Sequence, residues 1–352
     1  GSPYYLQSDL DEELSDLTKR VDTLRAAGSL SPAVLHRLRQ FFRIKSIYHS
    51  NAIEGNRLDL GETRLVVEQG LTITGKPLKD TIEAKNLAHA LDLFEQLASD
   101  NSRLVSEVDI RAIHQAILAT IDDGNAGRYR QSNVEISGSK YHPPGSGEVP
   151  ARMQELGEWL AQWSKPRAEE GIDAPIVAAA AHAWLAMVHP FIDGNGRTSR
   201  LLMNLILMRY GYPIAIITKD DRIRYYDALE ESQGGDLTPL VALVVECIQE
   251  SLEEYEEAAS EQRKQEEWAQ SIAASFGFKE ERKVRGEYEV WLNATELLKS
   301  YFNQTLEMVN DKSGGMVRGY FKDFGRLEFE KYAALRRGSS VKRTWSFRLD
   351  FR

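Results

Sequence analysis

The 352-residue chain contains a single cysteine, Cys247, within an apolar stretch of helical periodicity. One cysteine cannot form an internal disulfide, and its apolar surroundings indicate a buried thiol. The sequence also has no charged and apolar leader at its start, and it has no run of about eighteen apolar residues. We therefore expect a cytoplasmic protein that does not bind a membrane.

Two common kinds of site are missing as well. The seven histidines are scattered, and the sequence has neither a His-Glu-x-x-His motif nor a pair of cysteines, which excludes the usual zinc sites. A Gly-x-x-x-x-Gly-Lys-Ser/Thr loop, which holds nucleotide phosphates in many ATPases, is absent too. Any phosphate chemistry must therefore come from another motif.

Positive charge is scarce in most of the chain. The net charge is -9, but residues 279–352 hold 16 basic and 11 acidic residues, so this tail is +5 and residues 1–278 are -14. An acidic body repels phosphate backbones, which argues against nucleic acid as a partner except through the basic C-terminal tail. An ordinary mixed surface is the alternative for that tail.

Helical periodicity dominates the sequence. Apolar residues recur at helical spacing over residues 10–120, 153–163, 175–210 and 220–268, and the length suits about two domains. Beyond them, the pattern predicts a strand over 288–292, a helix over 294–309, a turn at 313–315 and a strand over 341–351. The fold is therefore mainly α with a small C-terminal mixed α/β domain, for which a winged helix is one candidate.

The most informative stretch is residues 189–200, which read HPFIDGNGRTSR between two apolar helical patterns. His189 is the only group here that can accept a proton near neutral pH, so its natural role is general base. Asp193 offers the hard oxygen that Mg²⁺ prefers. Arg197 and Arg200 lie three apart on one helical face, where they can clamp phosphate oxygens.

The glycines of this stretch favour the same chemistry. Gly194 and Gly196 allow a ligand to approach the backbone at the start of a helix, where free amide groups attract anions. Together these residues describe attack on a metal-bound phosphate. The plainer alternative is a pair of turn dipeptides with solvated arginines.

The stretch resembles the signature of the Fic family, His-x-Phe-x-Asp-Gly-Asn-Gly-Arg-x-x-Arg, without a substitution. Members of that family usually transfer AMP from ATP to a Ser, Thr or Tyr hydroxyl of a protein target, and pyrophosphate leaves. A kinase-like branch carries Lys in place of Gly196. The resemblance implies a base (His189), a Mg²⁺ ligand (Asp193), a phosphate clamp (Arg197), an anion cradle (Gly194, Asn195, Gly196) and a γ-phosphate partner (Arg200).

A second motif lies upstream, where Ser50 and Glu54 are four residues apart and therefore share a helical face. Gly55 is a plausible helix terminator, and a carboxylate in the last turn is disfavoured by the helix dipole. The residues alone favour a solvated helix end. The spacing resembles the inhibitory helix of Fic proteins, whose Glu pairs with the second signature arginine, which implies a Glu54–Arg200 pair.

Between these motifs, Val134 and Ile136 alternate before Ser137 and Gly138, which predicts a short β-hairpin. Its position resembles the Fic flap, whose backbone edge holds the target as an added strand. The resemblance implies that Glu135 and Ile136 bind the target. A purely structural hairpin is the alternative.

After the signature, Tyr225 and Tyr226 resemble the paired tyrosines that Fic proteins place near the adenine and ribose, where an aromatic ring can stack on a base. Packing against the core is the alternative for both side chains. Gln233 stands where close relatives carry Asn.

The predicted architecture is a Fic helical core with a short β-hairpin flap and an accessory domain. Its parts are an N-terminal helical segment (1–40), the inhibitory helix with a helical N-terminal part (41–120), the catalytic core (121–255), a charged helical linker (256–278) and the C-terminal domain (279–352).

The predicted function is autoinhibited adenylyl transfer to a protein hydroxyl, including the chain's own, with ATP as substrate and Mg²⁺ as cofactor. One alternative is an enzyme that is bifunctional or mainly removes AMP by means of Glu54. The other is a self-modifying DNA-binding regulator that uses the basic tail. The sequence leaves homo-oligomerisation open.

Overall fold

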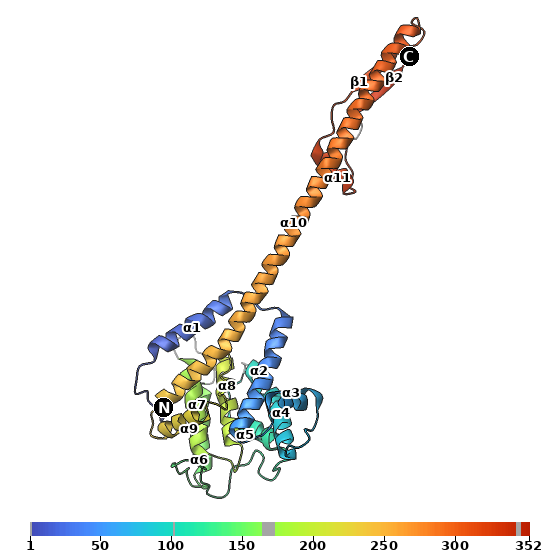
Figure 1. Cartoon of the computed structure of the whole chain (residues 1–352). Helices are drawn as coiled ribbons and strands as arrows, with labels where there is room; N and C mark the ends of the chain where they lie inside the picture. The colour runs from blue at the N-terminus through green and yellow to red at the C-terminus, as the bar shows by residue number, and fades with distance from the viewer. Residues whose placement is uncertain (1, 101–102, 164–172, 343–345) are drawn as a thin grey trace. The chain divides into compact units, whose positions relative to one another are not determined.

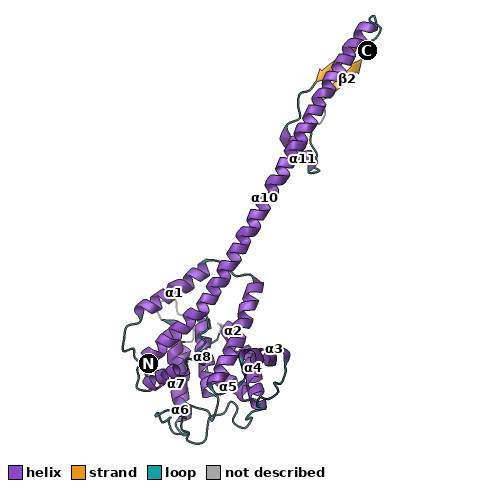
Figure 2. Ribbon diagram, in the orientation of Figure 1, coloured by secondary structure: helices purple, strands orange, loops and turns teal. Residues whose placement is uncertain are grey.

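The computed structural model describes residues 2–100, 103–163, 173–342 and 346–352, apart from the side chains of 277 and 278. It divides into two compact units, residues 1–262 and 263–352. Helices make up most of both units (Figures 1 and 2), which confirms the mainly α fold. The helices of the first unit are α1 (Asp11–Ala26), α2 (Pro32–Ile53), α3 (Leu60–Gln69), α4 (Leu78–Ser99), α5 (Glu107–Leu118), α6 (Val149–Trp163), α7 (Ala174–Val188), α8 (Asn195–Arg209), α9 (Arg222–Gln233) and the first part of α10 (Thr238–Lys312).

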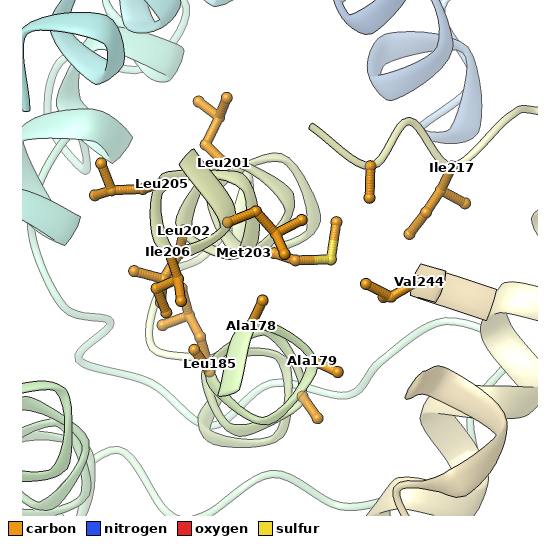
Figure 3. Packing of buried hydrophobic residues seen from close by; sticks show 14 of the residues in the cluster. Ala178, Ala179, Leu185, Leu201, Leu202, Met203, Leu205, Ile206, Ile217 and Val244 are labelled. Atoms are coloured by element: carbon orange, nitrogen blue, oxygen red, sulfur yellow. The ribbon is translucent and has the colours of Figure 1, made fainter. Parts of the chain in front are cut away.

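Helices α7 and α8 form the centre of the first unit. Helix α8 contacts α7, α4, α5 and α2, so it is covered on nearly every side. The alanine-rich face of α7 lets α8 approach closely, and Figure 3 shows Ala178 and Leu185 of α7 facing Leu202 and Ile206 of α8. Close packing of this kind gives the α7–α8 junction a rigid base.

Three helix ends meet where the signature residues lie. Glu54 is the C-cap residue that follows α2, and Gly55 comes next with a φ of 94°. His189 is the C-cap residue that follows α7, and α8 begins after Gly194, which has a φ of 79°. A positive φ suits glycine, so Gly55 and Gly194 can turn the chain sharply at these helix ends.

The second unit contains the rest of α10, the strands β1 (Gly319–Asp323) and β2 (Phe347–Phe351), and α11 (Phe329–Arg336). The strands pair antiparallel, with Gly319 opposite Phe351 and Asp323 opposite Phe347. The second unit is therefore mixed α/β, as the sequence predicts.

Two local predictions are wrong. The strand predicted over 288–292 lies inside α10, because Tyr288 and Trp291 share a helical face and both pack on Tyr332 of α11. The hairpin predicted around Val134 is a loop, since residues 131–140 are all described and none belongs to a strand. A turn does form there, closed by a 3.1 Å hydrogen bond from Ser139 N–H to Ile136 O.

Other local predictions can be compared with the structure directly. The helix predicted over 294–309 lies within α10, and the turn at 313–315 follows the helix end. Strand β2 covers only 347–351 of the strand predicted over 341–351, and residues 343–345 lie outside the described part. No helix in the described part combines the length and hydrophobicity needed to span a bilayer.

Candidate active site

A cavity of about 660 Å³ opens where α2, α7, α8, α9 and the loop after Arg130 come together. The structure brings nine of the residues singled out from the sequence into its wall: Glu54, Glu135, Ile136, His189, Asn195, Gly196, Arg200, Tyr225 and Tyr226. The other four, Ser50, Asp193, Gly194 and Arg197, lie outside that wall.

His189 occupies an unusual backbone conformation at the end of α7. Its φ of 48° and ψ of 57° are left-handed, which costs a residue with a side chain roughly 1–3 kcal/mol. Two hydrogen bonds hold it there, from His189 N–H to Leu185 O at 3.0 Å and from Arg130 Nε to His189 O at 2.8 Å. Such strain is typical of functional sites, where neighbouring contacts fix the geometry.

The surroundings of His189 keep its imidazole neutral. Nδ1 lies 3.4 Å from Ala186 O, and because a carbonyl can only accept, Nδ1 carries the proton and Nε2 keeps a lone pair. Burial lowers the pKa of His189; the Arg130 charge lowers it further, while the charges of Glu54 and Asp193 act in the opposite direction. The side chain is thus able to accept a proton at neutral pH.

The turn between α7 and α8 is held by two side chains, those of Asn195 and His114. The Asn195 amide forms hydrogen bonds with both backbone groups of Phe191. Its Oδ1 accepts from Phe191 N–H at 3.0 Å, and its Nδ2 donates to Phe191 O at 2.9 Å. The ring of His114 stacks on Phe191 with centroids 3.6 Å apart and lies 2.8 Å from Asp193 O through Nε2. Because Gly127 N–H donates to His114 Nδ1 at 2.9 Å, Nε2 carries the proton and donates.

His114 and Arg130 are functional residues that the sequence analysis missed. His114 is fully buried, and burial lowers its pKa to about 4, so it stays neutral and acts as a hydrogen-bonding strut. Arg130 is 1% exposed. His114 contacts Asp193, which is 79 residues away in the sequence, and Arg130 contacts His189, which is 59 residues away. A local sequence pattern therefore cannot predict either contact.

Arg200 contacts two residues at the end of α2, Ser50 and Glu54. Its Nε donates to Ser50 Oγ at 3.0 Å and its Nη2 to Ser50 O at 2.9 Å. The same Nη2 contacts Glu54 Oε1 at 2.7 Å in a salt bridge between side chains that are 6% and 31% exposed. Glu54 and Arg200, which the resemblance pairs, thus lie in contact in this structure.

Tyr225 completes the surroundings of Arg200. Its hydroxyl lies 3.3 Å from Arg200 Nη1 and 2.9 Å from His182 Nε2. Burial raises the pKa of Tyr225 to about 12, so the hydroxyl keeps its proton. Burial alone would lower the pKa of Arg200, but Tyr225 and Glu54 outweigh it and raise that pKa. Arg200 therefore stays charged, with its guanidinium committed to protein partners.

Gly196 makes room for the Glu54 carboxylate. A Cβ at this position would collide with Glu54 Oε1 and lie 3.1 Å from Arg200 Nη1. Glu54 therefore occupies the space just outside the first turn of α8, where free backbone N–H groups attract negative charge.

Arg197 and Asp193 lie beside this centre. Arg197 is 2% exposed, with Nη1 3.3 Å from Glu83 Oε1 and Nη2 3.6 Å from Asp193 Oδ1. Its Nε and Nη1 have no hydrogen-bond partner of adequate geometry among the described residues. Asp193 accepts from Gly194 N–H at 2.6 Å, and its side chain is half exposed.

The cavity mouth is formed by a loop and α9. Arg130 holds both ends of the loop, donating to Ser132 O at 3.0 Å and to Pro144 O at 2.5 Å. Tyr226 on α9 is 38% exposed, and its hydroxyl lies 3.5 Å from Ile53 O at the end of α2. Gln233 lies in the cavity wall as well.

Comparisons with known proteins identify relatives of this chain. The Fic/DOC family model matches residues 104–207. Curated relatives named protein adenylyltransferase Fic include those of Culex quinquefasciatus, 36% identical over 70% of this chain and 48% of the relative, and of Drosophila mojavensis, 36% identical over 72% and 49%. The chain thus spans about half the length of the curated relatives it matches.

Solved structures agree with this result. Fic-1 from C. elegans (residues 134–508) is 32% identical with a TM-score of 0.64, covering 71% of this chain and 73% of that one. A Fic domain containing signaling protein from Bacteroides thetaiotaomicron is 30% identical with a TM-score of 0.64, covering 70% and 97%. With this identity, this coverage and an unsubstituted signature in the cavity, the chain belongs to the Fic/DOC family.

Proposed function

We propose that this chain is a protein adenylyltransferase that Glu54 holds inactive. The observation that carries the proposal is the 2.7 Å contact between Glu54 Oε1 and Arg200 Nη2, in the wall of the cavity that His189 also lines. Relatives named protein adenylyltransferase support AMP as the transferred group.

The reaction follows from the protonation state of His189. A target hydroxyl gives its proton to His189 Nε2 while its oxygen attacks the α-phosphorus of ATP. The new bond joins that oxygen to the α-phosphorus, the bond between the α-phosphorus and the bridging oxygen breaks, and pyrophosphate leaves with the electron pair. Free N–H groups in the first turn of α8 stabilise the charge on the phosphate oxygens.

Inhibition follows from competition for one cation. Arg200 is the donor for the γ-phosphate, and in this conformation Ser50, Glu54 and Tyr225 occupy its guanidinium. A γ-phosphate at the same place would meet the Glu54 carboxylate, and like charges at short range repel. ATP then binds with its α-phosphate out of line for attack, which costs rate because near-attack geometry is lost.

Asp193 is the residue that would hold a Mg²⁺ ion. Its half-exposed carboxylate stands beside the start of α8, and one carboxylate plus phosphate oxygens and water is a usual donor set for this ion. No cluster of three His, Cys, Asp or Glu side chains that could hold a metal alone exists among the described residues, so the ion would arrive with the nucleotide. Bound there, it would neutralise phosphate charge and orient the leaving group.

The remaining roles follow from the positions around the cavity. Glu135 and Ile136 line its mouth, where an extended target segment could pair with the loop backbone and present its hydroxyl to His189. Tyr226 offers a partly exposed ring for the adenine, whereas Tyr225 is buried and supports Arg200. Arg197 lies outside the cavity wall, and its proposed role as a phosphate clamp is supported by two buried guanidinium nitrogens that have no hydrogen-bond partner among the described residues.

A second activity is favoured by one observation. The Glu54 carboxylate lines the same cavity as His189, so it can orient a water molecule toward an AMP-modified residue. Removal of AMP by water would then require Glu54, and the Glu54→Gly variant would transfer AMP without removing it.

The reaction type is tested with ATP labelled at the α- or the γ-phosphate. Glu54→Gly should incorporate α-label into protein at least about tenfold faster than wild type, because Arg200 is released to bind the γ-phosphate and the α-phosphate regains its alignment for attack. The double variant Glu54→Gly, His189→Ala and a reaction with EDTA should both give none. Incorporation of γ-label instead would identify a kinase, and equal α-labelling by wild type and Glu54→Gly would rule out inhibition by Glu54.

A further inference from the structure

The β1–β2 sheet of the second unit places cations directly opposite one another. In its register Lys322 lies opposite Arg348, and just beyond the strands Arg318 and Arg352 exchange backbone hydrogen bonds of 3.0 and 2.9 Å. Opposed side chains of an antiparallel pair are about 4.5–5.5 Å apart at Cβ, and like charges there are destabilising. Two such pairs on one face destabilise the sheet unless an anion lies between the cations.

The contacts of the opposite face show that this cationic face points outward. Gly319 has the Leu306 side chain of α10 where its own Cβ would stand. Phe321 stacks on Phe347 with centroids 5.5 Å apart, and Phe347 packs on Phe302 of α10. Residues of a strand alternate between its faces, so the cations and the residues between them point away from α10.

Aromatic side chains alternate with the cations on this outward face. Along β1 and the residues beside it the order is Arg318, Tyr320, Lys322 and Phe324, which places neighbours about 6.6 Å apart along the strand. Tyr320 is 47% exposed and Phe324 is 44% exposed. The Arg352 guanidinium lies 5.9 Å from the centroid of the Tyr320 ring, and the Lys322 ammonium lies 5.3 Å from that of Phe324.

The acidic residues nearby do not neutralise the face. Asp350 lies on the outward face opposite Tyr320 and pairs with Arg348 at 2.9 Å, so it offsets one of the four cations and leaves the other three. Asp323 lies on the other face, where it binds Lys299 at 2.8 Å. Residues 312–352 hold 11 basic and 4 acidic residues, a net charge of +7. The whole segment around the sheet therefore attracts anions.

We propose that the outward face of β1–β2 binds a single-stranded nucleic acid, with bases on Tyr320 and Phe324 and phosphates between the cations. A single strand alternates flat bases with phosphates, and that is the order of aromatic and cationic side chains along β1. A duplex keeps its base faces stacked inside, whereas an acidic peptide or an anionic bilayer has no such faces to stack. The proposal is independent of adenylyl transfer because the face lies wholly in the second unit.

The test uses the full chain without ATP and measures the fluorescence anisotropy of a labelled oligothymidine of about twelve nucleotides. Four cations should give a slope of log affinity against log salt of about -3, since each neutralised phosphate of a single strand contributes about -0.7. A duplex of equal length, phosphatidylserine vesicles and polyglutamate serve as competitors and should bind more weakly.

Matched variants locate the site. Lys322→Glu with Arg348→Glu should weaken binding at least about tenfold more than Lys331→Glu with Arg337→Glu, which changes the net charge equally on exposed residues at and just beyond α11. Tyr320→Ala should cost about tenfold through lost stacking.

A single substitution separates binding from folding. Lys322→Glu replaces a repulsive cross-strand pair with an attractive one, so thermal stability should be kept or raised while oligothymidine binding falls. The proposal is overturned if oligothymidine is not bound at low salt, or if both charge-reversed pairs of substitutions weaken binding equally. Tighter binding of the duplex, the vesicles or polyglutamate would overturn it too.

Discussion

His189 reaches its position through a backbone conformation that residues with a side chain seldom adopt, and the neighbouring groups that enforce it also decide its protonation. Burial and the Arg130 charge favour the neutral ring. A general base works in its neutral form, so activity is present above its pKa and is lost as the pH falls through it.

The lowered pKa of His189 gives a prediction for the pH dependence of AMP transfer. The rate of AMP transfer by Glu54→Gly should stay level near neutral pH and fall only below the ordinary histidine pKa of about 6.5. Removing Glu54 also removes a charge that raises the pKa of His189, so the fall is moved further toward acid pH. An acid limb at or above pH 6.5 would contradict the assignment of His189 as a buried neutral base.

Arg130 holds the backbone of His189, so its substitution should lower activity. In the Glu54→Gly background, Arg130→Met should lower kcat by about 10²-fold, because the carbonyl of His189 and both ends of the loop lose their donor. Loss of the Arg130 charge should also raise the pKa of His189, which moves the acid limb of the pH–rate profile to higher pH. Arg130→Lys should restore that limb, and Arg128→Met, at an exposed position, is the control. An unchanged profile in a folded Arg130→Met protein would exclude this role.

Among the elements, α2 is the one that the proposed inhibition requires to shift, because Glu54 lies at its end. The chain after Glu54 is tied to α4, since Asn56 Nδ2 donates to Asp80 O at 3.0 Å and to Glu83 Oε2 at 2.9 Å. Arg57 N–H adds a bond to Asp80 Oδ2 at 2.9 Å. Glu83 also lies beside Arg197, so the end of α2 and the signature helix share a support.

Loosening this tie should release part of the inhibition. Asn56→Ala should raise AMP transfer by up to about tenfold, because a hydrogen bond contributes roughly 0.5–1.5 kcal/mol. Gln69→Ala, at the exposed end of α3, is the matched control and should behave as wild type. A rate for Asn56→Ala equal to that of the control would mean that α2 is held by Glu54 alone.

The elements also show how far sequence reasoning reaches. The signature residues are contiguous, so the sequence placed the turn between α7 and α8 correctly. The Ser50–Glu54 spacing predicted only a shared helical face, and it was the resemblance to Fic proteins that implied the contact with Arg200. Contacts between distant segments were missed, as for His114 and Arg130. The predicted strand at 288–292 was wrong because its aromatic residues serve a helix that packs on α11.

At the scale of the whole molecule, the two proposed sites lie in separate units. The cavity with Glu54 and Arg200 lies entirely in residues 1–262, and the cationic sheet lies entirely in residues 263–352. Lys322→Glu with Arg348→Glu in the Glu54→Gly background should therefore keep self-modification by AMP within about twofold, because neither residue lines the cavity and surface substitutions usually have small effects. A large loss, measured with α-labelled ATP at physiological salt, would show that the units act together.

The central claim is that Arg200 exchanges Glu54 for the γ-phosphate of ATP. The most direct test is a crystal structure of Glu54→Gly with Mg²⁺ and an unreactive ATP analogue. Arg200 should then donate to a γ-phosphate oxygen, and the α-phosphorus should face the cavity side of His189. An Arg200 that contacts no phosphate, or a triphosphate bound away from the start of α8, would contradict the account.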